Sequence, residues 1–512
     1  MGYREISLKL PTDYNEDELR KGIGKELGIQ EFSYQIENKS LDARKKENIH
    51  WLVRVLVLSG EVEGGVPLLS PSLEIPYRKR RERAVVVGSG PAGFFAAFIL
   101  QKAGFHTTII ERGTDVHKRA EGIREFEKTG VFNPVSNYAF GEGGAGTFSD
   151  GKLTSRSKHI SKERQFILAS YISAGAPEEI GYMAHPHLGS DNLRKIVRNL
   201  RDAFSDIGGS VLFETMLEDL KIADGKVIEA ITTSGGIEAD YFIIAPGHSA
   251  YETYRMLIRR GVQFRTKSFA IGSRVEHPQE IINKAQWGRE RLAGVKAAEY
   301  RLTSPGDGNL PVYTFCMCPG GTVVPAAAYQ DTNIVNGMSL YMRDGKFANA
   351  ACVAGVHPDK LIGREATPEE ALDWLGALEQ SFYQYSDGFK APFCSIQNFI
   401  NRKEPAEIVE SSYPLELKPA ALWDLLPAEV SSSIREGLKD FSRKIKGFET
   451  GSIMGLESKT SSPIQVLREK DSRCTGFENL YLVGEGSGCA GGIISSGADG
   501  IKAAINIIEN NV

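Results

Sequence analysis

The stretch AVVVGSGPAGFFAAFILQKAGFHTTIIERG, residues 84–113, decides the fold of this chain. An apolar strand leads through a glycine-rich turn into an apolar helix, and a second strand follows. Gly88, Gly90 and Gly93 have the GxGxxG spacing of a dinucleotide-binding turn. The first glycine permits the tight turn, the second lets the backbone approach a pyrophosphate, and the third lets the helix pack closely on the strand. The stretch therefore predicts a Rossmann-like βαβ unit that binds a dinucleotide.

Charge complementarity supports the same interpretation. The pyrophosphate is expected at the helix N-terminus, where free N–H groups and the helix dipole favour an anion. Glu111 ends the second strand and is expected to accept hydrogen bonds from the adenosine ribose, although it could also be an ordinary surface glutamate. The residues that we expect to contact the cofactor from this unit are Gly88, Ser89, Gly90, Pro91, Ala92, Gly93, Glu111 and Arg112.

A second glycine-rich element lies near the other end of the chain, in NLYLVGEGSGCAGGIISSGADG, residues 479–500. It resembles the second flavin-contact element of the glutathione-reductase and related families, and this resemblance implies FAD rather than NAD. It assigns the flavin side to Gly484, Glu485, Gly491, Gly492 and Ile493, with Glu485 in the place of the usual aspartate. The helix that follows would direct its positive end at the negative charge of a reduced flavin. A purely structural glycine-rich loop is the alternative.

Further motifs make the resemblance more specific. GEGGAGTFSDGKL (141–153), FIIAPGHSA (242–250), FAIGSRVEHP (269–278) and TFCMCPGG (314–321) resemble those of a bacterial family of uncharacterised FAD-dependent, NAD(FAD)-utilizing dehydrogenase-like proteins. The resemblance covers nearly the whole chain and implies non-covalent FAD and an inserted domain, but no substrate. It also implies cofactor contacts from Gly143, Gly144, Gly146, Thr147, Ser149, Leu217 and Gly247.

The 512 residues are enough for several domains. Residues 1–76 predict a small βαββ (ferredoxin-like) module that ends in a proline-punctuated stretch. Residues 84–265 and 445–512 predict the FAD-binding domain, an α/β fold whose parallel sheet carries an antiparallel insert. Residues 266–444 predict an inserted α+β domain that covers the substrate. We expect the substrate between these two domains, because domain interfaces commonly host such clefts.

No catalytic acid or base is compelled by the sequence, because the flavin can carry the hydride itself. The leading candidates for substrate polarisation or proton transfer are Lys152, Arg274 and His277, and His185 or His187 is also available. Cys316 and Cys318 form a close thiol pair that could be redox-active, but a structural role is favoured because small buried cysteines are common. The cysteine spacing predicts no metal site. Because the sequence contains a single GxGxxG fingerprint, a second dinucleotide-binding domain is not predicted, and we expect NAD(P)H only as a transient electron donor.

The resulting prediction is an FAD-dependent oxidoreductase, of dehydrogenase type, acting on an unidentified small molecule by hydride transfer through flavin N5. One alternative is an RNA-binding or RNA-modifying flavoprotein, suggested by the βαββ module and the basic run Arg78–Arg83; such a run is more often solvated. Another is a non-catalytic flavin sensor. The net charge of −4 indicates no general affinity for nucleic acid or membranes. With no signal core or apolar span, a cytoplasmic location is expected.

Overall fold

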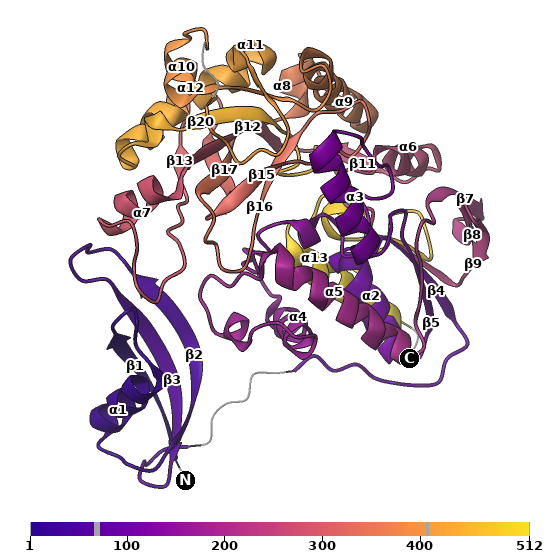
Figure 1. The fold of residues 1–512 in the computed structure, drawn as a ribbon. Helices are drawn as coiled ribbons and strands as arrows, with labels where there is room; N and C mark the ends of the chain where they lie inside the picture. Colours follow the sequence, from indigo (N-terminus) through magenta and orange to yellow (C-terminus); the bar gives the residue numbers. More distant parts are fainter. Residues whose placement is uncertain (1, 66–71, 406–408, 511–512) are drawn as a thin grey trace.

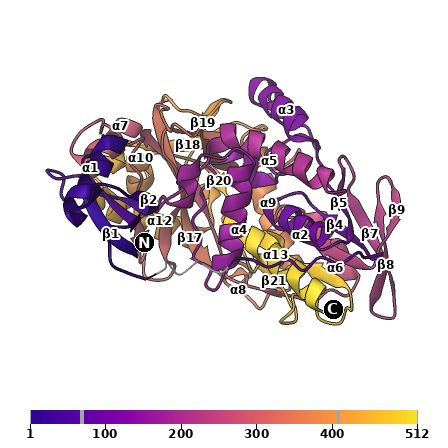
Figure 2. The same cartoon turned by 90° about the horizontal axis from the view of Figure 1, so that it is seen from below.

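The computed structural model describes residues 2–65, 72–405 and 409–510. Within them the chain forms a small N-terminal unit, a domain built on a parallel sheet, and a second domain built on a large antiparallel sheet (Figure 1). Seen from below, the N-terminal unit and the β7–β9 ribbon lie at opposite ends of the molecule (Figure 2). The predicted α/β fold class is confirmed.

The parallel sheet contains five strands among the described residues, in the order β22-β10-β4-β5-β6. All four neighbouring pairs are parallel. The predicted βαβ unit forms β4, α2 and β5, and the C-terminal strand β22 joins the sheet beside β10. The elements are β4 (Arg83–Val87), α2 (Pro91–Lys102), β5 (His106–Ile110), β6 (Ser210–Leu212), β10 (Tyr241–Ile244) and β22 (Leu480–Leu482).

The C-terminal helix α13 (Ile493–Glu509) packs directly on α2. Gly500 makes this possible, since an added Cβ there would lie 2.0 Å from the carbonyl oxygen of Ala92. The contact places the N-termini of α2 and α13, about 400 residues apart in sequence, in one region of the fold. Helices α4 (Ser161–Ser173) and α5 (Gly189–Asp206) extend this layer.

The predicted antiparallel insert is formed by β7 (Leu217–Ala223), β8 (Lys226–Thr232) and β9 (Gly235–Glu238). Along β8, exposed or half-buried side chains separate the buried ones, because one face of the insert packs on the parallel sheet and the other meets solvent. The chain then returns to the parallel sheet through β10.

The second domain contains a sheet of seven strands within the described ranges, ordered β13-β14-β17-β12-β20-β18-β19. Its central strands β12 and β17 are buried along almost their whole length. The strands are β12 (Phe269–Pro278), β13 (Thr303–Ser304), β14 (Val312–Cys318), β17 (Phe347–Val356), β18 (Ala391–Ser395), β19 (Leu417–Pro419) and β20 (Ser452–Glu457).

Strand β20 corrects the expected domain boundary at residues 444 and 445. We expected it in the FAD-binding domain, but it pairs with β12 and β18 in the middle of the second sheet. Its six residues are all buried. After β20 the chain returns to the FAD-binding domain. There β21 (Ile464–Val466) pairs antiparallel with β11 (Phe264–Thr266), the strand from which the chain enters the second domain.

The N-terminal unit has the predicted βαββ order, with β1 (Gly2–Leu10), α1 (Glu16–Leu27), β2 (Ser33–Asp42) and β3 (His50–Ser59). Asn15 and Glu18 form the expected capping box of α1. The outer edge of β2 contacts the rest of the chain. Lys39 donates its N–H to the Tyr182 carbonyl oxygen at 2.9 Å and accepts from the Ala184 N–H at 2.9 Å.

The basic run after this unit is not a simple solvated linker. The Arg80 side chain is 5% exposed, lies over the Phe105 ring at 4.5 Å and donates to the Ala103 carbonyl oxygen at 3.3 Å. Arg83 pairs with Glu238 at 3.5 Å. Both contacts attach the run to the FAD-binding domain.

The remaining elements complete the two domains. Within the described residues, no helix combines the length and apolar character needed to cross a membrane. The elements are α3 (Val116–Thr129), η1 (Ala145–Phe148), η2 (Glu178–Gly181), α6 (Tyr251–Arg259), α7 (Gln279–Trp287), β15 (Gly321–Pro325), β16 (Val335–Ser339), α8 (Pro358–Ile362), α9 (Pro368–Tyr385), α10 (Ile396–Asn401), α11 (Leu422–Leu425), α12 (Ala428–Lys444), η3 (Phe448–Thr450) and η4 (Gly484–Ser487).

Candidate functional site

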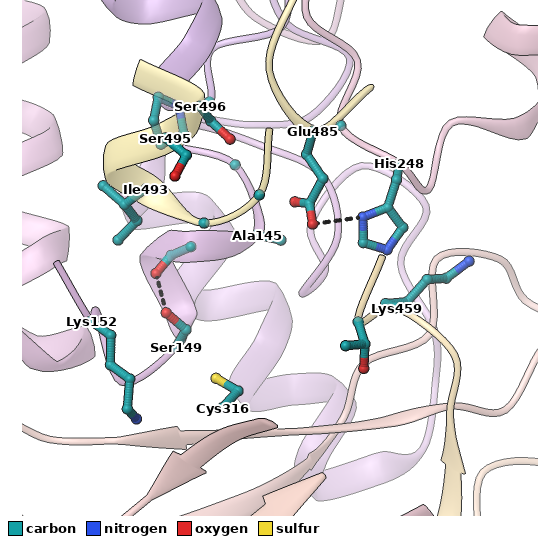
Figure 3. A pocket seen from close by; sticks show the side chains of 18 of the residues that line it. Ala145, Ser149, Lys152, His248, Cys316, Lys459, Glu485, Ile493, Ser495 and Ser496 are labelled. Atoms are coloured by element: carbon teal, nitrogen blue, oxygen red, sulfur yellow. Dashed lines mark hydrogen bonds and ion pairs between the residues drawn. The ribbon is translucent and has the colours of Figure 1, made fainter. Parts of the chain in front are cut away.

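A cavity of about 1500 Å³ lies between the parallel-sheet domain and the second sheet. One wall is formed by the glycine-rich segments after β4 and before α13, and the opposite wall by β14 and its neighbours (Figure 3). Pockets for drug-sized ligands usually measure about 300–1,000 Å³. The cavity therefore has room for a dinucleotide and a second small molecule.

The N-terminus of α2 opens into this cavity. Gly90 is its N-cap, no side chain among the described residues caps the helix, and Pro91 stands at the first helical position. A Cβ added to Gly90 would meet only the Gly144 Cα at 3.7 Å. The approach to the first N–H groups of the helix is thus open, as an anion site requires.

Glu111 lines the cavity, and its carboxylate also organises the surrounding loops. One oxygen accepts from the Ser89 N–H at 2.9 Å and the Ser89 hydroxyl at 2.7 Å. The other accepts from the N–H groups of Gly113 at 2.9 Å and Gly141 at 3.1 Å. A carboxylate offers about four lone-pair positions, and these four donors fill them. Glu111 therefore connects three segments of the FAD-binding domain whether or not a ribose is present.

The N-terminus of α13 faces the same space. A Cβ added at Gly491 or Gly492 would meet nothing within 4 Å, and Gly492 has a φ of +75°, which favours glycine. No described side chain caps this helix either. Two uncapped helix N-termini therefore open on one cavity.

Glu485 and His248 form a polar pair on the cavity wall (Figure 3). The Glu485 Oε1 lies 3.1 Å from the His248 Nδ1, and the buried His248 Nε2 has no hydrogen-bond partner among the described residues. The Tyr254 hydroxyl holds the neighbouring turns, donating to the carbonyl oxygens of Gly247 at 2.8 Å and Gly486 at 3.0 Å. The pair offers a ligand one carboxylate.

The structure brings most of the predicted cofactor residues to this one surface. Those that line the cavity are Gly88, Gly90, Pro91, Ala92, Glu111, Arg112, Gly144, Gly146, Ser149, Leu217, Gly247, Glu485, Gly491, Gly492 and Ile493. The others lie behind the wall: Ser89, Gly93, Gly143, Thr147 and Gly484. Gly93 and Gly484 serve packing, since an added Cβ would lie 2.0 Å from the Gly88 carbonyl oxygen and 2.5 Å from the Ala92 Cβ, respectively.

The three leading catalytic candidates lie in different environments. Lys152 lines the cavity, pairs with Asp150 at 2.7 Å and donates to the Met317 carbonyl oxygen. Arg274 is fully buried behind the wall and pairs with Glu457 at 3.1 Å. His277 is a core residue: its Nε2 lies 2.7 Å from the Phe448 carbonyl oxygen, and burial lowers its pKa to about 4. The structure therefore places only Lys152 on the cavity surface.

Several further residues that line the cavity were missed or discounted in the sequence. Cys316 lines the cavity, and Lys459 reaches it while pairing with the buried Glu379 at 2.8 Å. Arg156, Arg164 and Arg301 line its outer part and make no side-chain hydrogen bond or ion pair with any described residue. Their sequence neighbourhoods carry no motif, because the cavity gathers them from separate segments.

These residues fit FAD. Two open helix N-termini suit a pyrophosphate and the negative end of a reduced flavin, and the glycines between them leave the approach free. Gly90, Gly144 and the α2 N-terminus would hold the pyrophosphate, Glu485 the ribityl chain, and Gly491 to Ile493 the flavin. Glu111 would lie beside the adenosine.

Known families match three segments of the chain. A family described as FAD binding domain matches residues 81–243. One described as FAD-dependent protein, C-terminal domain-like, matches residues 268–460, and a domain of unknown function matches residues 3–58. Residues 81–243 contain β4, α2 and Glu111, the segment from which the dinucleotide site was predicted.

Individual proteins are similar to different degrees. Glycine oxidase from Bacillus cereus has a TM-score of 0.34 at 12% identity, covering 84% of this chain and 96% of its own. L-Proline dehydrogenase from P. horikoshii has a TM-score of 0.36 at 11% identity, covering 85% and 94%. An uncharacterized protein of Clostridium beijerinckii is 38% identical over 527 aligned residues, which cover 98% of each chain. That similarity extends through all the segments described above.

Proposed function

Because this chain belongs to the bacterial family of FAD-dependent proteins that includes its Clostridium beijerinckii relative, we propose that it is an FAD-dependent oxidoreductase of dehydrogenase type. Its substrate would be a small molecule bound between the two domains. The single observation that carries this proposal is that one cavity joins the FAD-binding segments to a wall of the second domain that carries Arg301, Arg343 and Lys459. A protein that only stores or senses flavin would not need that second half of the cavity.

Bound FAD would supply two-electron transfer at its N5 position. The chain itself would orient the two reactants and exclude water. Figure 3 shows Ser149, Ile493 and Lys152 on one side of the cavity and Lys459 on the other side, near His248. The two lysines are positioned to polarise a carbonyl or bind a carboxylate. Each is held by a buried carboxylate, Asp150 for Lys152 and Glu379 for Lys459.

The outer part of the cavity favours an anionic substrate. Arg156, Arg164 and Arg301 have no ionic partner within the described ranges. Three such guanidinium groups would attract and bind carboxylate or phosphate groups bidentately. NADH or NADPH, which carry phosphates, fit this region as transient donors, whereas a second nucleotide fingerprint is not found in the sequence.

The test is purification without added cofactor, identification of the flavin, and anaerobic reduction with NADH, NADPH and a panel of carboxylates and phosphate esters. We expect FAD to be present and to be bleached by at least one anionic compound. Arg301→Gln should then raise the KM for that compound about tenfold or more, while Arg124→Gln, an exposed arginine outside the cavity, should not. A flavin that no compound reduces would refute the proposal, and an unchanged KM in Arg301→Gln would refute the anionic substrate.

A further inference from the structure

The segment Cys316-Met317-Cys318 interrupts β14 where the strand meets the cavity. Its pairing with β17 shifts register between Phe315 and Cys318. Cys316 has a φ of +43°, a left-handed conformation that is uncommon outside glycine. Cys316 lines the cavity, whereas Cys318 is fully buried. The irregular backbone thus presents one thiol to the cavity and keeps the other directly behind it.

Two cations hold this segment in place, the fully buried Arg274 and Lys152 on the cavity surface. Both terminal nitrogens of Arg274 donate to the Cys316 carbonyl oxygen, at 3.3 and 3.4 Å, and Lys152 donates to the next carbonyl oxygen, that of Met317. The cations are themselves fixed by Glu457 and Asp150. The positive charges of Lys152 and Arg274 therefore lie beside the Cys316 sulfur, where they favour a thiolate.

The two thiols differ in the way that disulfide chemistry requires. The Cys318 thiol is folded back onto residue 316, with its sulfur 3.3 Å from the Cys316 carbonyl oxygen. A hydrogen bond from Cys318, with Lys152 and Arg274 nearby, holds the pKa of the Cys316 thiol below its ordinary value against the effect of burial. The pKa of Cys318 is raised by the same hydrogen bond and by burial. A low-pKa thiol with a protonated partner behind it is the usual arrangement of an attacking and a resolving cysteine.

Other cysteines of the chain lack this environment. Burial raises the pKa of Cys352, Cys394 and Cys474 to about 12. Cys352 lies on β17, in register with Thr314 of the strand that carries the pair. Cys352 is therefore a control residue that lies close to the pair and whose thiol pKa is raised, not lowered.

We propose that Cys316 and Cys318 are a redox-active dithiol that forms a reversible disulfide and exchanges two electrons with FAD in the cavity. Figure 3 shows the Cys316 sulfur directed into the space that Ser149 and Ile493 border. This inference rests on the FAD-binding role of the cavity.

The reaction balances within the protein and its cofactor. When the pair is oxidised, the two S–H bonds are lost and one S–S bond forms between Cys316 and Cys318. The two electrons and two protons pass to FAD, which becomes reduced. In the opposite direction reduced FAD returns them, the S–S bond breaks and both thiols re-form. No further oxidant or reductant is required.

The experiment counts electrons and thiols in the holoprotein. The protein is oxidised with excess diamide, a thiol-specific oxidant, freed of reagent and titrated anaerobically with dithionite. We expect about four electrons per FAD in the native protein, two for the flavin and two for the disulfide, and about two in Cys316→Ser and in Cys318→Ser. Cys352→Ala should still take up four. Peptide mass spectrometry after alkylation should find the 316–318 disulfide before titration and two alkylated thiols after it.

Photoreduction supplies the test of exchange. After light reduces the flavin of the oxidised protein anaerobically, the flavin absorbance should recover in the dark as the two thiols appear, and neither serine variant should show this recovery. An uptake of two electrons in the native protein, or full alkylation after oxidation, would overturn the pair as a redox centre. A disulfide with no dark recovery would overturn its exchange with FAD. Dithionite and light replace the unidentified substrate, so a failed substrate screen leaves these results unaffected.

Discussion

Glu111 shows how one residue can belong to a ligand site and to the fold at once. Its position at the end of β5 predicts a ribose acceptor, and it does line the cavity. The structure adds that the N–H groups of Ser89, Gly113 and Gly141 and the Ser89 hydroxyl already bind its carboxylate. The sequence could not reveal this, because Gly141 approaches only through the tertiary fold.

Glu111→Ala should therefore weaken both the cofactor site and the apoprotein. Three buried N–H groups would lose their acceptor, at a cost of about 1–3 kcal/mol for each that water does not reach. We expect FAD affinity to fall about tenfold or more and the apoprotein to lose about 2 kcal/mol or more of unfolding free energy. Fluorescence titration with FAD and denaturant unfolding of the apoprotein measure the two effects.

Glu125→Ala, an exposed glutamate on α3, provides the control and should change neither quantity. Lower FAD affinity with an unchanged apoprotein would mean that Glu111 acts on the ligand alone. Unchanged affinity in a destabilised apoprotein would remove Glu111 from the adenosine site.

The catalytic candidates mark the limit of sequence reasoning about single residues. Arg274 and His277 stand three apart on β12, a strand buried on both faces, and both are fully enclosed. Lys152, from a loop, reaches the cavity. Residue type and spacing cannot distinguish these outcomes, since the direction of each side chain depends on how the second sheet packs. For the same reason, the sequence favoured a structural role for Cys316.

At the scale of elements, the turn between β4 and α2 separates two kinds of glycine. Gly90 faces the cavity with open space ahead of it, whereas an added Cβ at Gly93 would lie 2.0 Å from a backbone oxygen. The fingerprint predicted this division of roles before the structure was known, because both roles follow from local strand–turn–helix geometry. The partner helix α13 could be placed beside α2 only through its resemblance to flavin-binding elements.

Gly90→Val should consequently lose FAD binding, whereas Gly93→Ala should lose stability. Gly90 has a φ of −67°, which valine can adopt, so we expect a folded protein that retains less than about a tenth of its FAD. Gly93→Ala should disrupt the packing of α2 on β4 and destabilise the whole FAD-binding domain by more than about 2 kcal/mol. Flavin absorbance of the purified variants and their thermal melting, followed by circular dichroism, distinguish the two effects.

Gly130→Ala, at the exposed end of α3, is a suitable control for a glycine with open space around it, although its φ of +72° makes a small loss of stability expected. Full flavin retention in Gly90→Val would mean that the pyrophosphate does not approach this turn. A Gly93→Ala protein as stable as the native one would show that α2 can move away from β4.

At the scale of the molecule, the sequence predicted the order of the parts better than their boundaries. The β11–β21 pair places both crossings between the two domains side by side, and β20 lies beyond them in the second sheet. A six-residue buried strand next to a glycine-rich region has the same local pattern in either domain. Only its partners β12 and β18, more than 50 residues away in sequence, determine where it belongs.

The attachment of the N-terminal unit leads to a whole-molecule prediction, because the segment that receives it continues directly into the cavity wall. Lys39 on β2 exchanges two hydrogen bonds with Tyr182 and Ala184, and His185 and Pro186 line the cavity. The Lys39 N–H points away from β3, so the β2–β3 ladder does not depend on it. The Lys39 side chain lies over the rings of Trp51 and Tyr14, at 4.6 and 4.7 Å, within its own unit.

Lys39→Pro should therefore detach the unit from the segment at 182–186 while leaving both folded, since proline removes the N–H at a strand edge where it is tolerated. We expect amide hydrogen exchange in a peptide covering these residues to accelerate about tenfold or more, with FAD retained. Lys39→Ala keeps the N–H and loses only the ring contacts, so its exchange in this peptide should stay near the native rate. Equal exchange in Lys39→Pro and the native protein would show that other contacts hold the unit. Loss of FAD from Lys39→Pro alone would mean that the N-terminal unit supports the cofactor site itself, and not only the substrate side of the cavity.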